Sequence, residues 1–170
     1  MIDCEWIVCE RSNRWAAALR MAIGRDAAAG GPRRRLREVR RLAELTAELA
    51  QRPASFVAIE IHRNNLGEAL EWLAAARQYP LTRCVALVDR SLPSTVASLA
   101  PSGPATEREI RAALREAGAL DVAESSRGLH AVLELGRRHA AVVSAAQQAV
   151  PGNDLPLEDR VWAALPWQPD

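Results

Sequence analysis

Three acidic residues follow apolar stretches of the sequence and are the first candidates for chemistry. They are Glu10, Glu60 and Asp89, and each lies at or next to the end of a run that is typical of a buried strand. In a parallel sheet the strand ends meet at one edge, where such carboxylates could bind Mg²⁺ or Ca²⁺. In the alternative, which we favour, the acids face solvent or pair with three arginines nearby in the sequence: Arg11, Arg63 and Arg90.

A run of arginines is the second candidate site. Six of them fall within nine residues: Arg33, Arg34, Arg35, Arg37, Arg40 and Arg41. Such a run could bind nucleic-acid phosphates, which makes a nucleic-acid-associated regulator one hypothesis. Glutamates lie in and after the run, no aromatic residue is interleaved, and the net charge of the whole chain is only +1. We therefore favour a solvated face or a protein-binding patch over a nucleic-acid interface.

The remaining residue types exclude several kinds of chemistry. The chain has no lysine, which rules out Schiff-base and P-loop chemistry. His62, His130 and His139 lack the spacing of zinc ligands, so we expect no metal and no cofactor. The three cysteines adjoin apolar runs, as free buried thiols in a reducing cytoplasm do. We find no signal-peptide or membrane-span pattern in the sequence, and we expect a cytoplasmic protein without membrane contact.

Strand-like and helix-like patterns alternate along the chain, and they must position these residues. Strands are expected at residues 5–9, 36–39, 55–61, 83–88 and 120–123. The second of these stretches could instead begin a long helix. The first helix is expected to start at Ser12 or Asn13 and to end between Gly24 and Pro32. Alternating strands and helices predict an α/β fold, a three-layer α/β/α sandwich around a five-stranded parallel sheet.

The length and composition fit one domain followed by a tail. Residues 1–150 are expected to form the α/β domain, with insertions near residues 24–35 and 91–105. Residues 151–170 contain prolines and one short amphipathic pattern that begins near Pro156. Four apolar residues of this pattern share a helix face: Leu157, Val161, Trp162 and Leu165. Such a tail docks either on its own domain, which we favour, or in the groove of a partner.

Two stretches of the sequence resemble the receiver domains of response regulators. Residues 56–61, followed by residues 66–70, are similar to the third strand and third helix of receivers. Residues 113–122, with their Ala-Gly-Ala turn, resemble the fourth helix and fifth strand. The resemblance implies a flavodoxin-like strand order of 2-1-3-4-5. It also implies that a homodimer could form through the side that carries the long final helix.

The residues that receivers use for phosphotransfer are replaced in this chain. Glu10 and Arg11 stand where receivers have the paired acids that hold Mg²⁺, and Glu60 stands at the phosphoacceptor aspartate. The last two signature positions hold Asp89 in place of a hydroxyl residue and Ser125 or its neighbour in place of the lysine. By this resemblance Glu60 carries a permanent charge at the position where receivers gain a charge reversibly, by phosphorylation of the aspartate.

The replaced residues argue against phosphotransfer on physical grounds. Glutamate is one methylene longer than aspartate, which displaces the attacking oxygen, and the missing lysine removes a charge-assisted contact worth roughly 1.5–3 kcal/mol. We therefore expect a degenerate receiver, or pseudo-receiver, that is neither phosphorylated nor an enzyme. Its expected role is a constitutive regulatory module that binds a protein partner or a second copy of itself. A nucleic-acid-associated regulator and a small ligand- or metal-binding protein are the alternatives.

Overall fold

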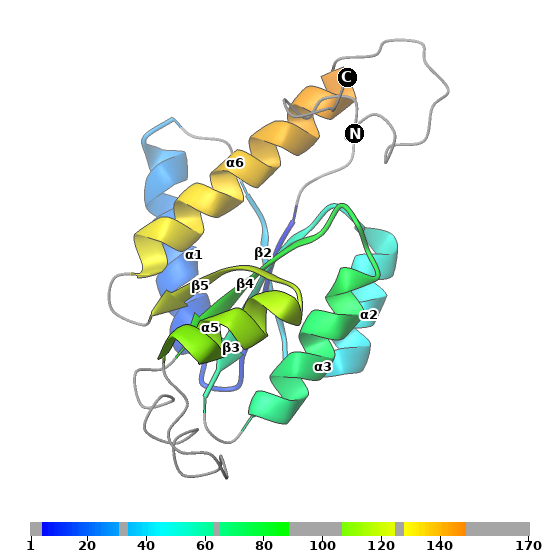
Figure 1. Ribbon diagram of the computed structural model, residues 1–170. Helices are drawn as coiled ribbons and strands as arrows, with labels where there is room; N and C mark the ends of the chain where they lie inside the picture. Colours follow the sequence, from blue (N-terminus) through cyan, green and yellow to red (C-terminus); the bar gives the residue numbers. More distant parts are fainter. Residues whose placement is uncertain (1–4, 31–33, 63–64, 89–106, 125–127, 149–170) are drawn as a thin grey trace, which may run out of the picture.

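The structure of the chain is a computed structural model that describes residues 5–30, 34–62, 65–88, 107–124 and 128–148. Within these ranges five strands alternate with five helices (Figure 1). The strands are β1 (Trp6–Cys9), β2 (Leu36–Val39), β3 (Phe56–Ile61), β4 (Arg83–Val88) and β5 (Ala119–Glu124). The helices are α1 (Arg14–Ala28), α2 (Leu42–Gln51), α3 (Leu66–Arg77), α5 (Glu107–Glu116) and α6 (Gly128–Gln148).

The strands form one parallel sheet in the order β2-β1-β3-β4-β5. The predicted three-layer fold and the order 2-1-3-4-5 are thus confirmed, and residues 36–39 are an edge strand. In the register of the sheet, Trp6 lies opposite Leu36 on one side and Phe56 on the other. The chain order reverses between β1 and β3, and in this kind of sheet the carboxyl ends of those strands form the usual binding crevice.

Apolar side chains on the two faces of the sheet form separate cores. Ile7 and Cys9 contribute to one core together with residues of α2, α3 and α5. Trp6 and Val8 contribute to the other core together with residues of α1 and α6. Figure 1 shows the first group of helices and the second group on opposite sides of the sheet. Because successive side chains of a strand point to opposite faces, a strand covered on both sides needs apolar residues at nearly every position.

Helix α6 approaches β1 closely because it has a glycine at the contact. Gly136 lies against the indole ring of Trp6, and a Cβ atom at this position would overlap the ring. Trp6 also packs on Phe56, with their ring centroids 5.1 Å apart. Beyond this contact α6 continues past the amino ends of the strands, where Val143 packs with Leu81 in a third apolar cluster (Figure 1).

The helix boundaries agree with the sequence predictions that concern glycines. Helix α1 continues through Gly24 and ends at Ala28, shortly before Gly30, whose φ is 87°. Gly24 is exposed and costs the helix only about 1 kcal/mol, whereas Ile23 beside it is buried in the core. Gly118, predicted to follow the end of α5, has φ 121°, a conformation that glycine adopts without strain.

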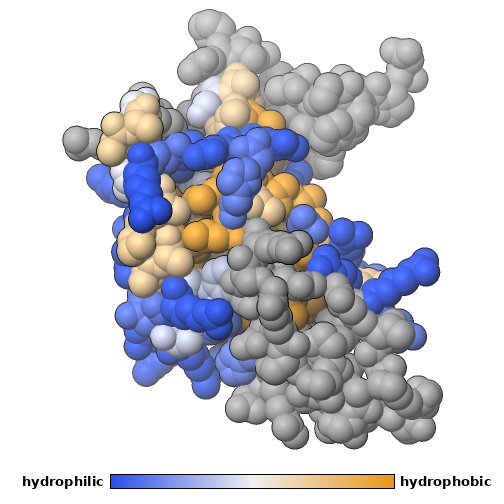
Figure 2. Space-filling model, turned by 90° about the vertical axis from the view of Figure 1, so that its left-hand side faces the viewer, coloured by the Kyte–Doolittle hydropathy of each residue, from blue (hydrophilic) through white to orange (hydrophobic). Residues whose placement is uncertain are grey.

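One face of the molecule has hydrophobic residues at its centre. Figure 2 shows the side of the molecule that lies at the left of Figure 1, where hydrophobic residues collect in the middle of the face and hydrophilic residues surround them. Among the described residues, no helix is both long and apolar enough to cross a membrane.

Candidate functional site at the carboxyl ends of the strands

Glu10 follows β1 directly and is buried, with an exposed fraction of 1%. Its Oε1 accepts a hydrogen bond from the backbone N–H of Ala16 at 2.6 Å, and its Oε2 accepts one from Trp15 at 2.7 Å. These N–H groups belong to the first turn of α1 and have no acceptor within the helix. Asn13 is the N-cap residue, as predicted, but its side chain makes no capping hydrogen bond. Glu10 therefore performs the capping, and the positive end of the helix dipole stabilises its carboxylate.

Glu60 projects from the end of β3 into the same edge of the sheet and is 7% exposed. The hydroxyl of Ser12 donates to Oε1 of Glu60 at 2.7 Å, and the backbone N–H of Arg11 donates to Oε2 at 3.2 Å. The Ser12 oxygen also lies 3.3 Å from Oε2 of Glu10 and accepts the N–H of Arg14 at 3.3 Å. The loop between β1 and α1 thus joins the two glutamates through one serine.

The loop after β3 is fixed by Asn65. Its side-chain oxygen accepts the backbone N–H of His62 at 2.8 Å, and its amide donates to the carbonyl of Glu60 at 2.7 Å. Asn65 is the N-cap residue of α3, but its side chain makes no capping hydrogen bond and closes the turn after the strand instead. Arg11 forms a salt bridge of 2.9 Å with Glu68, a residue in the first turn of α3. These contacts link β1, β3, α1 and α3 at a single edge.

Glu10 and Glu60 lie at the edge predicted from the sequence, but their surroundings differ from the prediction. Both acids are buried and hydrogen-bonded by backbone N–H groups, so the favoured interpretation, that they face solvent or pair with neighbouring arginines, is wrong for these two. Arg11 binds Glu68 with its guanidinium and Glu60 only through its backbone. The signal for Ser12 was available, because a hydroxyl two residues after Glu10 in the same loop can reach both acids.

Each of the four carboxylate oxygens of Glu10 and Glu60 accepts at least one hydrogen bond from the protein. These hydrogen bonds satisfy buried acceptors and hold both carboxylates in place. In the part of the chain that the structure describes, no three acidic, histidine or cysteine residues are grouped so that they could hold a metal ion. Two further predicted positions of this site, Asp89 and Ser125, lie outside the described residues.

The arginine run is largely used within the protein. Arg34 pairs with Asp26 and lies over the ring of Trp6 at 5.8 Å. Arg37 pairs with Glu5 and Glu48, and Arg40 pairs with Glu38. Arg35 and Arg41 are exposed, and Arg33 lies outside the described residues. Because successive residues of β2 point to opposite faces, the run does not form one continuous basic surface.

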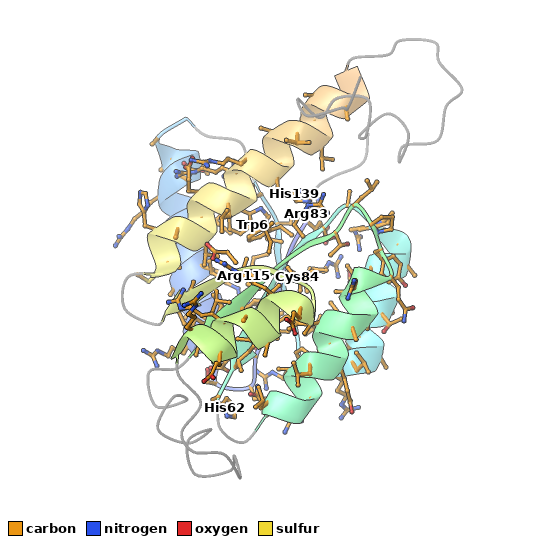
Figure 3. The ribbon with its side chains drawn as sticks, viewed as in Figure 1. Trp6, His62, Arg83, Cys84, Arg115 and His139 are labelled. Carbon is orange, nitrogen blue, oxygen red and sulfur yellow. The ribbon has the colours of Figure 1, made fainter. Side chains whose placement is uncertain are left out.

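The histidines and cysteines that the structure describes do not come together at the acidic edge. Figure 3 shows His62 at the opposite end of the sheet from His139. Burial lowers the pKa of His139 to about 4, although its Nε2–H donates to the carbonyl of Ala54 at 2.9 Å, which opposes the shift. Burial raises the pKa of the Cys84 thiol to about 12. Burial also raises the pKa of the Cys9 thiol well above its ordinary value, and the nearby Cys84 adds to this shift. Both thiols are free and stay protonated at neutral pH, as expected for buried structural cysteines.

The tail residues predicted to dock, Leu157, Val161, Trp162 and Leu165, lie outside the described residues.

Comparison with known proteins bears on the fold. No protein-family model matches the chain, and no curated protein matches it significantly. A CheY-like protein (tadZ) from Pseudomonas aeruginosa PAO1 has a similar structure, with a TM-score of 0.51 and 20% identity over 79% of this chain and 98% of that one. A putative pilus assembly protein (cpaE) from Burkholderia thailandensis E264 has a TM-score of 0.52 and 19% identity over 83% of this chain and 99% of that one. The chain therefore shares its α/β fold with these proteins.

Proposed function

We propose that this chain is a receiver-like module that is not phosphorylated and that acts by binding a protein in one constant conformation. The observation that carries the proposal is the bonding of Glu10 and Glu60 at the carboxyl ends of β1 and β3. In a receiver this place is kept for a cation and a phosphoryl group. Here a serine hydroxyl and backbone N–H groups, from the β1–α1 loop and the first turn of α1, bind the two carboxylates.

The chemistry of the residues supports the same conclusion. An acceptor carboxylate must present an oxygen to the phosphoryl donor beside a divalent cation. Both oxygens of Glu60 accept hydrogen bonds, and both oxygens of Glu10 hold the first turn of α1, which leaves fewer lone pairs for a cation than a free carboxylate has. The chain also has no lysine to neutralise the charge of a transferred phosphoryl group. A fixed anion cluster without a switchable charge favours a scaffold over a switch.

Binding of a protein is the role that remains for such a domain. One of the similar structures is described as a putative pilus assembly protein. At this level of identity the likeness extends to the fold, so we take a pilus-assembly complex only as the first place to seek the partner. A second copy of this chain is the other candidate, and sedimentation velocity over a concentration series tests for it. The arginine run supports neither nucleic acid nor a membrane as partner, because internal acids bind several of its members.

Incubation with acetyl phosphate and Mg²⁺, followed by intact-mass spectrometry, tests the absence of phosphotransfer. We expect no added phosphoryl mass on the parent chain. We expect none on Glu60→Asp either, because that substitution restores the acceptor type but not the lysine. A phosphoryl mass that appears on the parent chain and is lost in Glu60→Gln would refute the proposal. A conventional receiver domain treated in the same way serves as the positive control.

A further inference from the structure

A cavity of about 1050 Å³ lies at the other end of the sheet, near the amino ends of β4 and β5. Helix α6 bounds one side, and the ends of α3 and α5 bound the other. Much of its lining is apolar: Tyr79, Leu81, Leu120, Val142 and Val143. Leu120 is 51% exposed, which is unusual for a large aliphatic side chain on a sheet. Figure 3 shows four further lining residues around this region: Arg83, Cys84, Arg115 and His139.

The rim of this cavity is basic. Its charged lining residues are four arginines and one glutamate: Arg77, Arg83, Arg115, Arg138 and Glu116. Arg77 donates to the carbonyl of Glu116, and Arg83 donates to the carbonyls of Pro80 and Thr82. Within the described ranges, Arg77 and Arg83 thus bind carbonyl oxygens and have no carboxylate partner, whereas Arg115 pairs with Asp121 and Arg138 pairs with Glu134. An acidic and apolar segment is the complement of such a cavity.

The end of the chain has this composition. Residues 149–170 contain four acids and one arginine, together with the apolar face of Leu157, Val161, Trp162 and Leu165. With this spacing, the four residues would lie on one face of a short helix. We propose that residues 155–165 fold back onto their own domain and bury this apolar face in the cavity between α6 and the ends of α3 and α5. The acids of the tail then lie near the arginines of the rim.

The length of the connection allows this docking. Val142 and Val143 line the cavity, and α6 ends at Gln148, about 8 Å further along its axis. From Gln148 to Leu157 the chain can span up to about 30 Å. It passes through Pro151-Gly152, a dipeptide typical of turns. The tail can therefore reverse direction and reach the cavity without any change in α6.

A thiol placed in the cavity tests the docking in the full chain. Leu120→Cys puts a reactive group on the exposed wall, and Leu70→Cys puts one at the exposed Leu70 of α3 as a reference. We expect maleimide to label the thiol at position 120 about tenfold more slowly than the one at position 70, because apolar burial stabilises the docked tail. Adding Trp162→Ser should abolish the difference. Adding Trp167→Ser, which changes the same residue type outside the apolar face, should leave it intact.

The native thiols supply the folding control. Cys9 is buried, so its labelling in the same sample, followed by peptide mass spectrometry, reports any loss of the fold. Leu165→Ser replaces Trp162→Ser if the first variant unfolds. Equal labelling at positions 120 and 70 in the parent background overturns the proposal. So does protection that survives both Trp162→Ser and Leu165→Ser.

The concentration dependence of the protection separates docking within one chain from docking between chains. Protection that stays constant over a wide range of protein concentration supports docking within the chain. Protection that grows with concentration overturns it and assigns the cavity to the tail of a second copy. Neither result depends on whether the acidic edge accepts a phosphoryl group.

Discussion

At the scale of single residues, Glu10 is the side chain on which the acidic edge depends. It is 1% exposed, and its two oxygens accept the N–H groups of Trp15 and Ala16. A buried carboxylate is stable only when its oxygens are bonded, and the start of α1 supplies both donors. The same two contacts determine where α1 begins and where the Ser12 loop lies.

Glu10→Gln should destabilise the protein. A glutamine side chain has one acceptor oxygen and one NH₂ donor. Its NH₂ group would therefore face the N–H of Trp15 or Ala16, and one of the two capping bonds would be lost. We expect the free energy of unfolding to fall by about 1–2 kcal/mol, as measured by urea denaturation. Glu71→Gln, on the exposed side of α3, is the matched control and should change it by less than about 0.5 kcal/mol. Equal effects of the two substitutions would contradict the capping role.

His139 should make the stability depend on pH. Burial lowers its pKa to about 4, while the unfolded chain keeps a value of about 6.5. The unfolded state therefore binds more protons between these values, and the free energy of unfolding falls as the pH falls through this window. Between about pH 7 and pH 5 the parent chain should lose about 2 kcal/mol more than His139→Gln does.

The matched control for this pH effect is on the same helix. His130 is exposed, and His130→Gln should keep the pH dependence of the parent chain. Urea denaturation of the three proteins at both pH values measures the effect. If His139→Gln retained the full dependence, the histidine would not be the source.

Residue types alone predicted part of the acidic site. The positions of Glu10 and Glu60 at the ends of strands followed from the apolar runs before them. Most of their partners could not be predicted, because they are the backbone N–H groups of Arg11, Trp15 and Ala16. The positions of these groups depend on the path of the chain at Asn13, which has φ 57°. A non-glycine residue in this conformation gives little signal in a single sequence.

At the scale of elements, the contact between α6 and β1 explains the position of the longest helix. Trp6 projects from β1 toward α6, and Gly136 lets the helix come close enough to cover the ring. Glycine costs a helix about 1 kcal/mol relative to alanine, so its place in α6 reflects this packing.

Two glycine substitutions should have opposite effects. Gly136→Ala should destabilise the protein by about 1–3 kcal/mol, because the new methyl group overlaps the Trp6 ring. Gly24→Ala should stabilise it by about 0.5–1 kcal/mol, because a methyl group at that helical position meets no atom within 4 Å. Thermal denaturation measures both changes. A rise in Tm for both variants would show that α6 does not require the glycine.

The elements were the best-predicted level of this protein. Strands buried on both faces, such as β3 and β4, are nearly continuous apolar runs and are easily found. The short edge strand β2 was ambiguous because its pattern, Leu36 to Val39, has two charged residues between two apolar ones. Its pairing with β1 is a tertiary contact, and the local sequence does not specify it.

At the scale of the whole molecule, arginines and acids form ion pairs between different elements and do not form one surface of a single charge sign. Glu5 at the start of β1 binds Arg37 of β2 and Arg52 after α2, and Asp26 of α1 binds Arg137 of α6. The net charge is +1. Such a distribution does not attract a polyanion over long range.

The chain should accordingly not bind nucleic acid. In an electrophoretic mobility assay at an ionic strength of about 150 mM, we expect no shift of a short DNA or RNA duplex. The triple variant Arg35→Ala, Arg40→Ala, Arg41→Ala should behave like the parent chain. A salt-dependent shift that this variant loses would instead assign the arginine run to nucleic acid.

The proposed function depends on the state of the acidic edge, and NMR of the backbone amides measures that state directly. Beryllofluoride with Mg²⁺ imitates a phosphoryl group, and the amides of Arg11, Trp15 and Ala16 donate to the two glutamates. We predict that these resonances and that of Glu60 stay unchanged throughout a titration. Saturable shifts at these amides, strongest at Glu60, would show that the site opens to a cation and a phosphoryl group, and would contradict a constitutive module.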